Sequence, residues 1–533
     1  MRFGFSNESS STKAPTRLDR LVMQDHEDGE WLLPRQAIRL VMMLLAFSSA
    51  AAIVVFAVLA VLRLNSYYGI NHVSGSWMAL TQYADTDAGI YPPLYDSAHQ
   101  VYGGTRFMPE TILLNLAASK ITGEYLASGK LVALLCSLLL LALTLLVLKR
   151  LGCPTPISLA LTSAILTTSA GFDSIFTIRG DALSVFWQLL AVTLVAGSQR
   201  PRPDARWTAL AAISCVLAVL GKFSAIWGLM AILMWLLAKG QRRLLILFSG
   251  VFFVGLLVSF GALQVLTHGR MLDNLLASSF AGVAGSLPPT RIQDLGWFVI
   301  EGTQTIWVLS PFALLGIVMA VRHKSKANIY HLSFGCALAV TVVIYTDSGA
   351  GPNHLLDIVV LTLILIGDFW CRVAPRTRTL VTPQVILALL LLWVIPLAHA
   401  WNLAVRFRAA AYSTDHPNST GRLLASQLLP DDLILSEDPT VPVSHGQRPV
   451  VLDAFMLTRI GVKHPGWVQD LRRRIEGCDF NKVVLLFAID DPTKQFWYAT
   501  QHFGEEVAAA IRDKYQLAAH TQGYYIYVPS RDC

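Results

Sequence analysis

The interpretation of residues 207–238, WTALAAISCVLAVLGKFSAIWGLMAILMWLLA, decides the fold. As a single helix this stretch would be about 48 Å long at ~1.5 Å per residue, whereas the hydrocarbon core of a bilayer is about 30 Å thick. A single helix would also place the basic residues before it and after it on opposite sides of a membrane. We therefore predict a hairpin that turns at Gly221-Lys222, which brings both basic clusters to one side: Arg200, Arg202 and Arg206, and Lys239, Arg242 and Arg243.

The composition around this hairpin is that of a membrane protein. The chain has 533 residues, of which 54% are hydrophobic and 14% are charged, whereas a soluble protein has about 25% charged residues. This excludes an ordinary soluble enzyme, a disordered scaffold and a small secreted domain held by disulfides. The seven cysteines form no CxxC motif and no Cys/His pairing, so the sequence indicates no zinc or redox site.

The fold class follows from the apolar stretches, because a spanning helix needs about 20 mostly apolar residues. The hairpin contributes two of eleven predicted spans, and we expect a mainly α, polytopic bundle of transmembrane helices over residues 37–402. The predicted spans are 37–62, 126–148, 155–173, 181–198, 207–221, 223–238, 243–266, 296–321, 329–346, 354–371 and 383–402.

The basic residues orient this bundle. Lys and Arg number 42, Asp and Glu 35, and the net charge is +7. With eleven spans the clustered cations fall on one side, which the positive-inside rule identifies as cytoplasmic. Residues 1–36 are then a cytoplasmic tail without a cleavable signal peptide, and the odd number of spans places the C-terminus outside. Because the charge surplus is explained by topology, we expect no nucleic-acid partner.

Two further segments are predicted outside the membrane core. Residues 108–122, MPETILLNLAASKIT, have apolar residues at helical spacing on one side and polar residues on the other, which predicts a helix at the outer interface. Residues 403–533 contain short apolar runs at 433–435, 483–487 and 524–528 and helical character at 504–515, which predicts a small extracytoplasmic α/β domain. A disulfide between Cys478 and Cys533 is compatible with that location.

Ionisable residues beside a membrane are the first candidates for function, because burying them there is costly. The first outer loop, residues 64–125, carries Asp85, Asp87 and Asp96, followed by Arg106 and Glu110. Its acids and many aromatic residues suit a base that activates a hydroxyl, or ligands for a hard cation. The alternative is that these acids cap a helix or face water.

Two cations lie in predicted outer turns. Arg179, in Arg179-Gly180-Asp181, suits phosphate binding through its planar guanidinium, with Asp181 orienting it. Lys222, at the tip of the hairpin, needs an anionic partner, which could be a substrate phosphate or a buried Asp. The alternative for both is contact with lipid headgroups.

The last cluster precedes a late span. Asn353, His354 and Asp357 fall on one face of a helix start, after a glycine-rich turn. Such a helix N-terminus is suited to an anion, and the alternative is an ordinary helix cap. All four clusters lie on the outer side of the predicted topology, which indicates a site that handles a lipid phosphate.

At these residues the chain resembles the bacterial C-type (GT-C) membrane glycosyltransferases, relatives of the protein mannosyltransferase and aminoarabinose transferase group. The resemblance covers about residues 65–533. It rests on the acidic first outer loop with its interfacial helix and on the outer C-terminal domain. It also rests on three motifs: Arg-x-Asp-Ala-Leu at 179–183, Gly-Lys-x-Ser-Ala at 221–225 and Asn-His-Leu-Leu-Asp at 353–357.

The resemblance implies transfer of a hexosyl or pentosyl group from a polyprenyl-phosphate donor to a glycan, lipid or protein acceptor outside the bacterial inner membrane, with inversion. The family's essential acid corresponds to Asp87, with Asp85 as the competing candidate, since Asp-Thr-Asp stands where many relatives have adjacent Asp and Glu. The expected phosphate-binding residues are Arg179, Lys222, His354 and Asn353, supported by Asp181, Arg106 and Asp357. Metal use varies in the superfamily; we assign no metal ligand, and a divalent cation stays open.

Two other functions fit parts of the pattern. A transporter or flippase of a lipid-linked or small anionic substrate would use the same cations without chemistry, but the sequence shows no internal repeat of the kind transporters often have. A sensor would need a cytoplasmic output module, which we do not find in the sequence. The prediction is therefore a membrane glycosyltransferase, with a transporter as the alternative.

Overall fold

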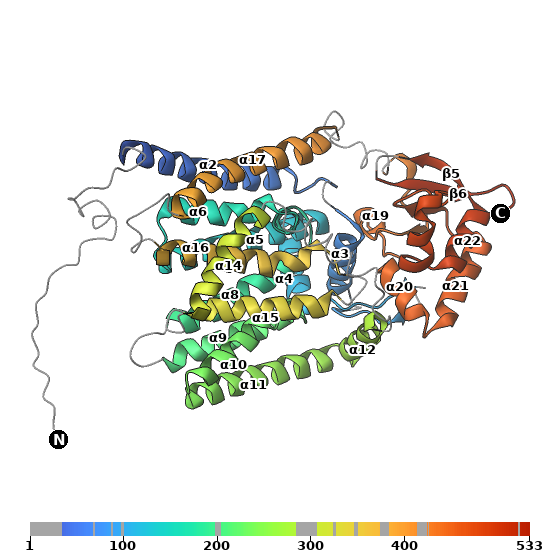
Figure 1. The fold of residues 1–533 in the computed structure, drawn as a ribbon. Coiled ribbons are helices and arrows are strands. Elements are labelled where there is room, and N and C mark those ends of the chain that lie inside the picture. The colour runs from blue at the N-terminus through green and yellow to red at the C-terminus, as the bar shows by residue number, and fades with distance from the viewer. Residues whose placement is uncertain are drawn as a thin grey trace, which may run out of the picture.

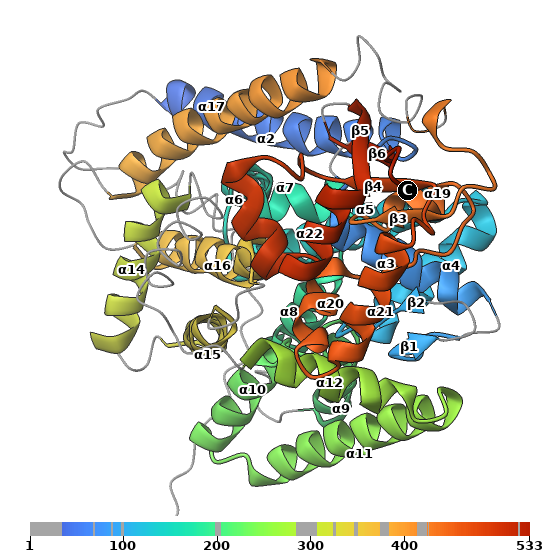
Figure 2. The same cartoon turned by 90° about the vertical axis from the view of Figure 1, so that its right-hand side faces the viewer.

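The computed structural model describes residues 35–67, 70–86, 89–96, 101–197, 204–283, 306–322, 327–345, 350–373, 383–412, 424, 426–520 and 523–533. Long apolar helices lie side by side, and a mixed domain of helices and strands is attached at one end (Figure 1). The face of the molecule at that end is formed by the C-terminal domain together with α12 (Arg270–Val283) and the first-loop elements (Figure 2).

Each of the eleven predicted spans coincides with an apolar helix or helix pair, although residues 296–305 of one span lie outside the described residues. Among the described residues, five helices are long and apolar enough to cross a membrane on their own. They are α2 (Arg35–Leu62), α5 (Tyr125–Arg150), α11 (Arg242–Leu266), α16 (Leu356–Val373) with the preceding η3 (Pro352–Leu355), and α17 (Pro383–Tyr412). Five are shorter: α8 (Asp181–Gly197), α9 (Ala205–Gly221), α10 (Trp227–Ala238), α14 (Ile306–Arg322) and α15 (Ile329–Ile344).

The predicted span 155–173 is broken. It consists of α6 (Thr155–Ala164), η1 (Ile165–Thr167) and α7 (Ser169–Phe176), with a bend of 79°. Thr168 has an extended backbone and its hydroxyl accepts a hydrogen bond from Gly171 N, so it caps a new helix. Apolar periodicity does not reveal such a break, because the residues on both sides are buried.

The 207–238 hairpin is confirmed. α9 ends at Gly221 and α10 begins at Trp227, with Lys222 in the connection. The two arms pack mainly on other helices: α9 against α8 and α11, and α10 against α15. The turn therefore lies between helices at the same end of the bundle as the starts of α8 and α16 (Figure 1).

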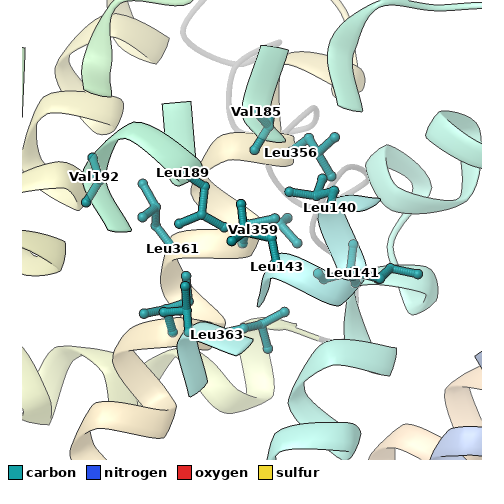
Figure 3. Close-up of a cluster of buried hydrophobic side chains, with 14 of the residues drawn as sticks. Leu140, Leu141, Leu143, Val185, Leu189, Val192, Leu356, Val359, Leu361 and Leu363 are labelled. Carbon is teal, nitrogen blue, oxygen red and sulfur yellow. The ribbon is translucent and has the colours of Figure 1, made fainter. Parts of the chain in front are cut away.

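The core of the bundle is made of aliphatic side chains from α5, α8 and α16. Leu140, Leu143, Leu189, Val359 and Leu363 are among its fully or almost fully buried members (Figure 3). In contrast, α11 exposes Phe253, Leu257 and Val258 by more than 60% each, as expected for a helix in contact with lipid. The central helices are thus held by protein packing, and the outer helices present apolar surface to the membrane.

The first outer loop contains two helices and a small hairpin. α3 (His72–Asp85) is followed by β1 (Tyr95–Asp96), which pairs antiparallel with β2 (Val101–Tyr102), and by α4 (Pro109–Thr122). α4 is the predicted interfacial helix. Its polar residues Thr111, Asn115 and Ser119 are buried against protein, whereas Leu113 and Ile121 are exposed by 43% and 86%. Ile112 of the same helix is fully buried, so only part of its apolar side, with Leu113 and Ile121, faces away from the protein as in a helix in contact with lipid.

The C-terminal domain is a small α/β domain, as predicted, and its strands form a four-stranded sheet. The strand order is β3-β4-β6-β5, with β3 (Ile434–Ser436) parallel to β4 (Lys482–Leu485) and the other pairs antiparallel. β6 (Tyr525–Pro529) was predicted, whereas β5 (Tyr515–His520) was not. The helical elements are α19 (Thr440–Ser444), α20 (Ala454–Gly461), α21 (Pro465–Glu476), η4 (Pro492–Lys494), η5 (Trp497–Gln501) and α22 (Glu505–Lys514).

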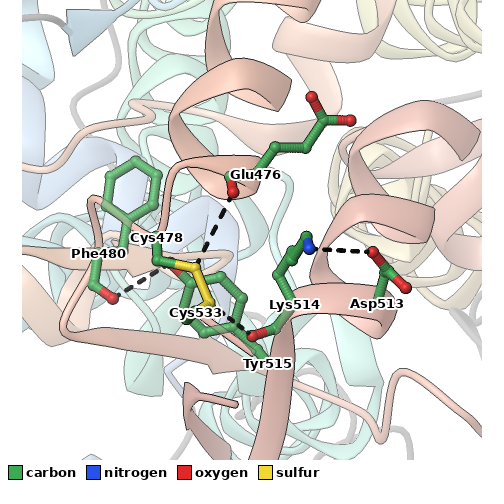
Figure 4. The surroundings of a disulfide bond; sticks show 7 residues. All are labelled: Glu476, Cys478, Phe480, Asp513, Lys514, Tyr515 and Cys533. Atoms are coloured by element: carbon green, nitrogen blue, oxygen red, sulfur yellow. Dashed lines mark hydrogen bonds and ion pairs between the residues drawn. A yellow bond between two sulfur atoms is a disulfide. The ribbon is translucent and has the colours of Figure 1, made fainter. Parts of the chain in front are cut away.

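A disulfide closes this domain. Cys478, two residues after α21, is bonded to Cys533 at the C-terminal end of the sequence, with their Cα atoms 5.9 Å apart (Figure 4). Next to it, the hydroxyl of Tyr515 donates a hydrogen bond of 3.1 Å to Phe480 O. The bond ties the residues that follow β6 to the loop between α21 and β4.

The C-terminal domain is docked on the first outer loop by backbone contacts. Tyr102 N donates to Val450 O at 2.8 Å, and Leu452 N donates to Tyr102 O at 3.0 Å. The side chain of Gln82 in α3 donates to Gln447 O, and α19 packs against α3. The first loop and the C-terminal domain therefore form one surface over the end of the bundle.

Candidate functional site

A partly buried ionic cluster, in which Asp181 is the buried member, joins three elements that are far apart in the sequence. The ammonium of Lys222 lies 2.5 Å from Asp181 Oδ1 and donates to His354 Nδ1 at 2.9 Å. The amide of Asn353 donates to both oxygens of Asp181, at 3.1 and 3.0 Å. Three of the four predicted clusters thus meet at one point, where α8 begins, α9 ends and η3 leads into α16.

Asp357 lies beside this group. Its Oδ1 accepts a hydrogen bond of 2.6 Å from the indole N–H of Trp227, the first residue of α10. Lys222 and Asp181 act on Asp357 electrostatically. Asp357 therefore supports the cluster and fixes the start of α10 against the start of α16.

Two glycines allow these turns to approach each other. A Cβ on Gly180 would lie 2.6 Å from Thr111 Oγ1 of α4 and 3.3 Å from Gly221 O. A Cβ on Gly221 would lie 2.8 Å from Ser184 Oγ and 2.9 Å from Glu110 Oε2. The interfacial helix, the Arg179 turn and the hairpin turn are therefore packed at a distance that only glycine permits.

Two arginines add positive charge to this end of the bundle. Arg179 acts electrostatically on Asp181, on His354 and on His72 at the start of α3. Its Nε is buried and has no hydrogen-bond partner among the described residues. Arg106 acts on His354 and also on Asp453 of the C-terminal domain, and its guanidinium lies 5.8 Å from the Phe455 ring centroid. These cations connect the membrane end of the site with the C-terminal domain.

The acids proposed for the first loop lie elsewhere or outside the described residues. Asp85, at the C-terminal end of α3, is paired with Lys120 and accepts a hydrogen bond of 2.9 Å from the hydroxyl of Tyr125. The hydrogen bonds from Lys120 and Tyr125 lower the pKa of Asp85. Among the described residues, no hydrogen bond or ion pair links Asp85 to the Lys222 cluster. Asp87 is outside the described residues.

Glu110, which the sequence predicts in the first outer loop, lies next to the hairpin turn at Gly221. It accepts a hydrogen bond of 2.8 Å from the indole N–H of Trp187, and its Oε2 lies near Gly221. Burial raises the pKa of Glu110 to about 7. Glu110 is therefore a carboxyl group that can gain or lose a proton near neutral pH.

The C-terminal domain contains a buried pair of ionisable residues, Glu437 and His502, that the sequence did not single out. The carboxylate of Glu437 is fully buried and lies 2.6 Å from the Nδ1 atom of His502, which is 1% exposed. The ring of His502 lies 4.5 Å from the ring of His72, centroid to centroid. Each residue is isolated in the sequence, so no spacing motif could have indicated this group.

Within the described ranges, no three His, Cys, Asp or Glu side chains converge in a way that could hold a metal ion. The described part of the site instead offers ammonium, guanidinium, amide and imidazole groups. These groups are suited to an anion with several oxygens, such as a phosphate.

Comparisons with known proteins identify the fold. The structure matches that of ArnT from Cupriavidus metallidurans bound to undecaprenyl phosphate, with a TM-score of 0.58, 13% identity, and coverage of 90% of this chain and 98% of ArnT. It also matches the archaeal oligosaccharyltransferase AglB from Archaeoglobus fulgidus in complex with an inhibitory peptide and a dolichol-phosphate, with a TM-score of 0.51, 13% identity, and coverage of 91% and 74%. No family model and no curated protein matches the sequence. The predicted fold, a polytopic helical bundle with a small C-terminal α/β domain, is confirmed and is shared with ArnT and AglB.

Proposed function

We propose that this protein is a membrane glycosyltransferase that moves a sugar from a polyprenyl-phosphate-linked donor to an acceptor outside the cytoplasmic membrane, with inversion at the anomeric carbon. The observation that carries the proposal is the cluster of Lys222, His354, Asn353 and Arg179 around Asp181, at one end of a GT-C bundle. Two proteins of the same fold have structures with a polyprenyl phosphate bound.

The cluster provides what a donor phosphate requires. Lys222 is held in place by Asp181 and His354, and its ammonium can still donate a third hydrogen bond. Arg179 has a buried Nε without a partner among the described residues, and an unpaired buried donor of this kind costs stability until it is bonded. A phosphate group bound between them would satisfy both. Asp181, Arg106 and Asp357 would keep these groups in position.

The reaction needs a base on the acceptor side and cations on the leaving-group side. A carboxylate of the first loop, Asp87 or Asp85, would take the proton of the acceptor hydroxyl as its oxygen attacks the anomeric carbon. The bond from the sugar to the phosphate oxygen breaks, and Arg179 and Lys222 stabilise the charge that develops on the polyprenyl phosphate. The exposed apolar side of α4, with Leu113 and Ile121, would contact the prenyl chain or the lipid around it.

The proposed location is the bacterial inner membrane, with residues 1–36 in the cytoplasm, residues 37–402 as the transmembrane part, and residues 403–533 outside. The last turn of α5 contains Lys149 and Arg150, and the last turn of α14 contains Arg322. The predicted topology places both of these helix ends on the cytoplasmic side. The disulfide Cys478–Cys533 fits an oxidising compartment for the C-terminal domain.

Transfer is tested with purified full-length protein in lipid nanodiscs and a panel of radiolabelled undecaprenyl-phosphate sugars. We expect one label to move to lipid, glycan or protein from a cell-envelope extract, and Asp87→Asn or Asp85→Asn to abolish the transfer. If no label is transferred but the protein in liposomes moves the labelled lipid across the bilayer, the protein is a transporter instead.

A further inference from the structure

The exposed side of α12 is apolar, although this helix lies outside the predicted spans. Only a short turn separates α12 (Arg270–Val283) from the end of α11, and the two helices pack against each other. Val265 and Leu266, at the end of α11, are exposed by more than 70%, and Leu272 and Leu276 of α12 are 45% and 46% exposed. The apolar surface that α11 presents to lipid is therefore followed directly by an apolar surface on α12.

The opposite side of α12 is joined to the first outer loop. Asn274 is fully buried, and its Nδ2 atom donates hydrogen bonds of 2.9 Å to Pro92 O and to Arg270 O. Its Oδ1 atom accepts a hydrogen bond of 2.9 Å from Thr105 N. At about 100° per residue, Asn274 lies roughly 160° around the helix from both exposed leucines. The buried amide therefore fixes α12 to the loop on both sides of the β1–β2 hairpin and turns the two leucines away from it.

Two further sides of α12 contact the bundle and the C-terminal domain. Met271 and Leu275 are buried in one cluster with Met108, the residue before α4. Ala277 packs against apolar residues of α20 (Figure 2). Asp273 is exposed and borders the two leucines on the helix surface. α12 thus combines a side packed on protein, an apolar outer side and a charged edge, which is the pattern of a helix that lies in a membrane interface.

We propose that α12 lies along the membrane surface at the end of the bundle that carries the C-terminal domain, with Leu272 and Leu276 among the acyl chains of that leaflet. Its partner is the hydrocarbon of the membrane lipids, and Asp273 faces the headgroups. Through Asn274 it holds the first outer loop, and through Ala277 and α20 it holds the C-terminal domain, at a fixed height above the bilayer. The proposal does not depend on the proposed function, since a transporter of the same fold would use the same anchor.

A second protein is the alternative occupant of this surface, and the structure favours lipid. A stable protein interface takes about 20–30 residues from each partner, whereas α12 offers two exposed leucines next to the carboxylate of Asp273. The same leucines follow a helix whose exposed residues, such as Leu257 and Val258, already face lipid. Continuity with that surface therefore identifies the lipid as the partner.

The test measures the depth of these side chains in full-length protein in lipid nanodiscs. A nitroxide is attached through Leu272→Cys or Leu276→Cys, and its accessibility to oxygen, which concentrates in hydrocarbon, is compared with that to a water-soluble nickel chelate. Leu257→Cys in α11 is the lipid reference. Leu517→Cys on β5, far from the bundle, is the matched water reference, since Leu517 is 49% exposed (Figure 1). Wild-type protein treated in the same way gives the background from the native thiols.

We expect the ratio of oxygen to nickel accessibility at positions 272 and 276 to exceed that at 517 by roughly threefold or more and to stay below that at 257, as for a helix at the boundary of the hydrocarbon. Ratios equal to that at 517 would place this side of α12 in water and overturn the proposal. Low accessibility to both reagents would show that protein covers the two leucines, which also overturns it.

The holding role of Asn274 is tested by hydrogen exchange. Asn274→Ala removes both hydrogen bonds to the first outer loop, so amide exchange in residues 101–107 should become about tenfold faster or more. Ser278→Ala is the matched control, because Ser278 is also buried in α12 and its hydroxyl has no hydrogen-bond partner among the described residues; exchange should stay as in the wild type. Unchanged exchange in Asn274→Ala would show that α12 does not hold this loop.

Discussion

Two partly buried clusters of the same residue types lie near the two ends of α16, each around a buried carboxylate. The cluster at its start contains Asp181, Lys222, His354 and Asn353. The cluster at its end contains Asp368, Arg372, His331 and Asn328. His354 and Asp368 are about 21 Å apart along the helix at ~1.5 Å per residue. Each cluster has one carboxylate, one cation, one histidine and one asparagine, yet we assign a ligand to only one of them.

The cluster at the end of α16 is an ion pair within one helix, joined by an asparagine from the start of α15. Arg372 binds both oxygens of Asp368, at 2.6 and 3.0 Å, from one turn further along the same helix. Asn328 donates to Asp368 at 3.0 Å and, together with His331, forms a capping box at the start of α15. Two neighbouring helices therefore supply all four residues, and the arrangement locks α15 to α16.

The cluster at the start of α16 is built differently. Its residues come from three separate elements, and its cation is an ammonium, which unlike guanidinium does not occupy both carboxylate oxygens in one planar contact. Arg179 and Arg106 lie within electrostatic range of the same group. The comparison shows that residue types do not identify a site; the number of elements that converge and the surplus of cations do.

The largest expected effect comes from removing the cation at each end in turn. Lys222→Met should weaken binding of undecaprenyl phosphate by roughly 30-fold or more, because the loss of one charged partner costs about 2–5 kcal/mol. Arg372→Met is the matched variant and should lower the melting temperature without changing this binding. Equilibrium binding to protein in nanodiscs measures both. Equal loss of binding in the two variants would remove the distinction between the clusters.

The next largest effect concerns the close packing of Gly180 against α4, beside the Lys222 cluster. Gly180→Ala should destabilise the protein by about 1–3 kcal/mol, because its new methyl group would overlap Thr111 Oγ1. Gly335→Ala in α15 is the control, since a Cβ there meets nothing within 4 Å. Thermal unfolding in detergent compares the two. Similar melting temperatures for both variants would contradict the packing of α4 against the Arg179 turn.

A smaller effect is expected from pH. The pKa of Glu110 is raised by burial from 4.5 to about 7, so the folded protein binds this proton more tightly than the unfolded chain. The resulting stabilisation is complete below pH 4.5 and is lost as the pH rises to about 7. Glu110→Gln, which keeps an acceptor for Trp187, should flatten this decline in melting temperature. A parallel decline in wild type and variant would show that Glu110 does not titrate in this range.

The smallest expected effect concerns the cysteines, which differ between the end of α16 and the C-terminal domain. Cys153 and Cys371, near the end of α16, have their sulfur atoms 3.1 Å apart without a disulfide between them, whereas Cys478 and Cys533 form a disulfide. Intact protein from cells, denatured without reductant, should therefore show five reactive thiols among its seven cysteines. Mass spectrometry after alkylation counts them. Seven reactive thiols would argue against an oxidising location of the C-terminal domain.

Most of the architecture could be predicted because it depends on local composition. The apolar helices at the eleven predicted spans, the turn at Gly221-Lys222, the helix at 109–122 and the strands β3, β4 and β6 all follow from hydrophobic runs and their period. The break at Thr168 and strand β5 could not be predicted in this way. The break depends on one side-chain cap, and β5 has mostly exposed residues and pairs only with β6.

The site was predictable only in part. The sequence and the family resemblance together selected Arg179, Lys222, Asn353 and His354, because charged or polar residues beside membrane spans are few. Neither source selected His72, His502 or Glu437, since each is an ordinary residue in a loop or at a helix end until the C-terminal domain docks. The first-loop acids Asp85 and Asp87 remain predictions, and Asp85 is engaged with Lys120 and Tyr125.

The sequence by itself determined that this chain is a polytopic membrane protein and which of its segments form apolar helices. It does so because the cost of placing charges in hydrocarbon is large and acts on each segment separately. Only the tertiary structure decided which of two similar clusters has converging cations, and which residues of the C-terminal domain meet the first loop. Those choices depend on contacts between segments hundreds of residues apart, such as His72 with His502, and no local pattern encodes them.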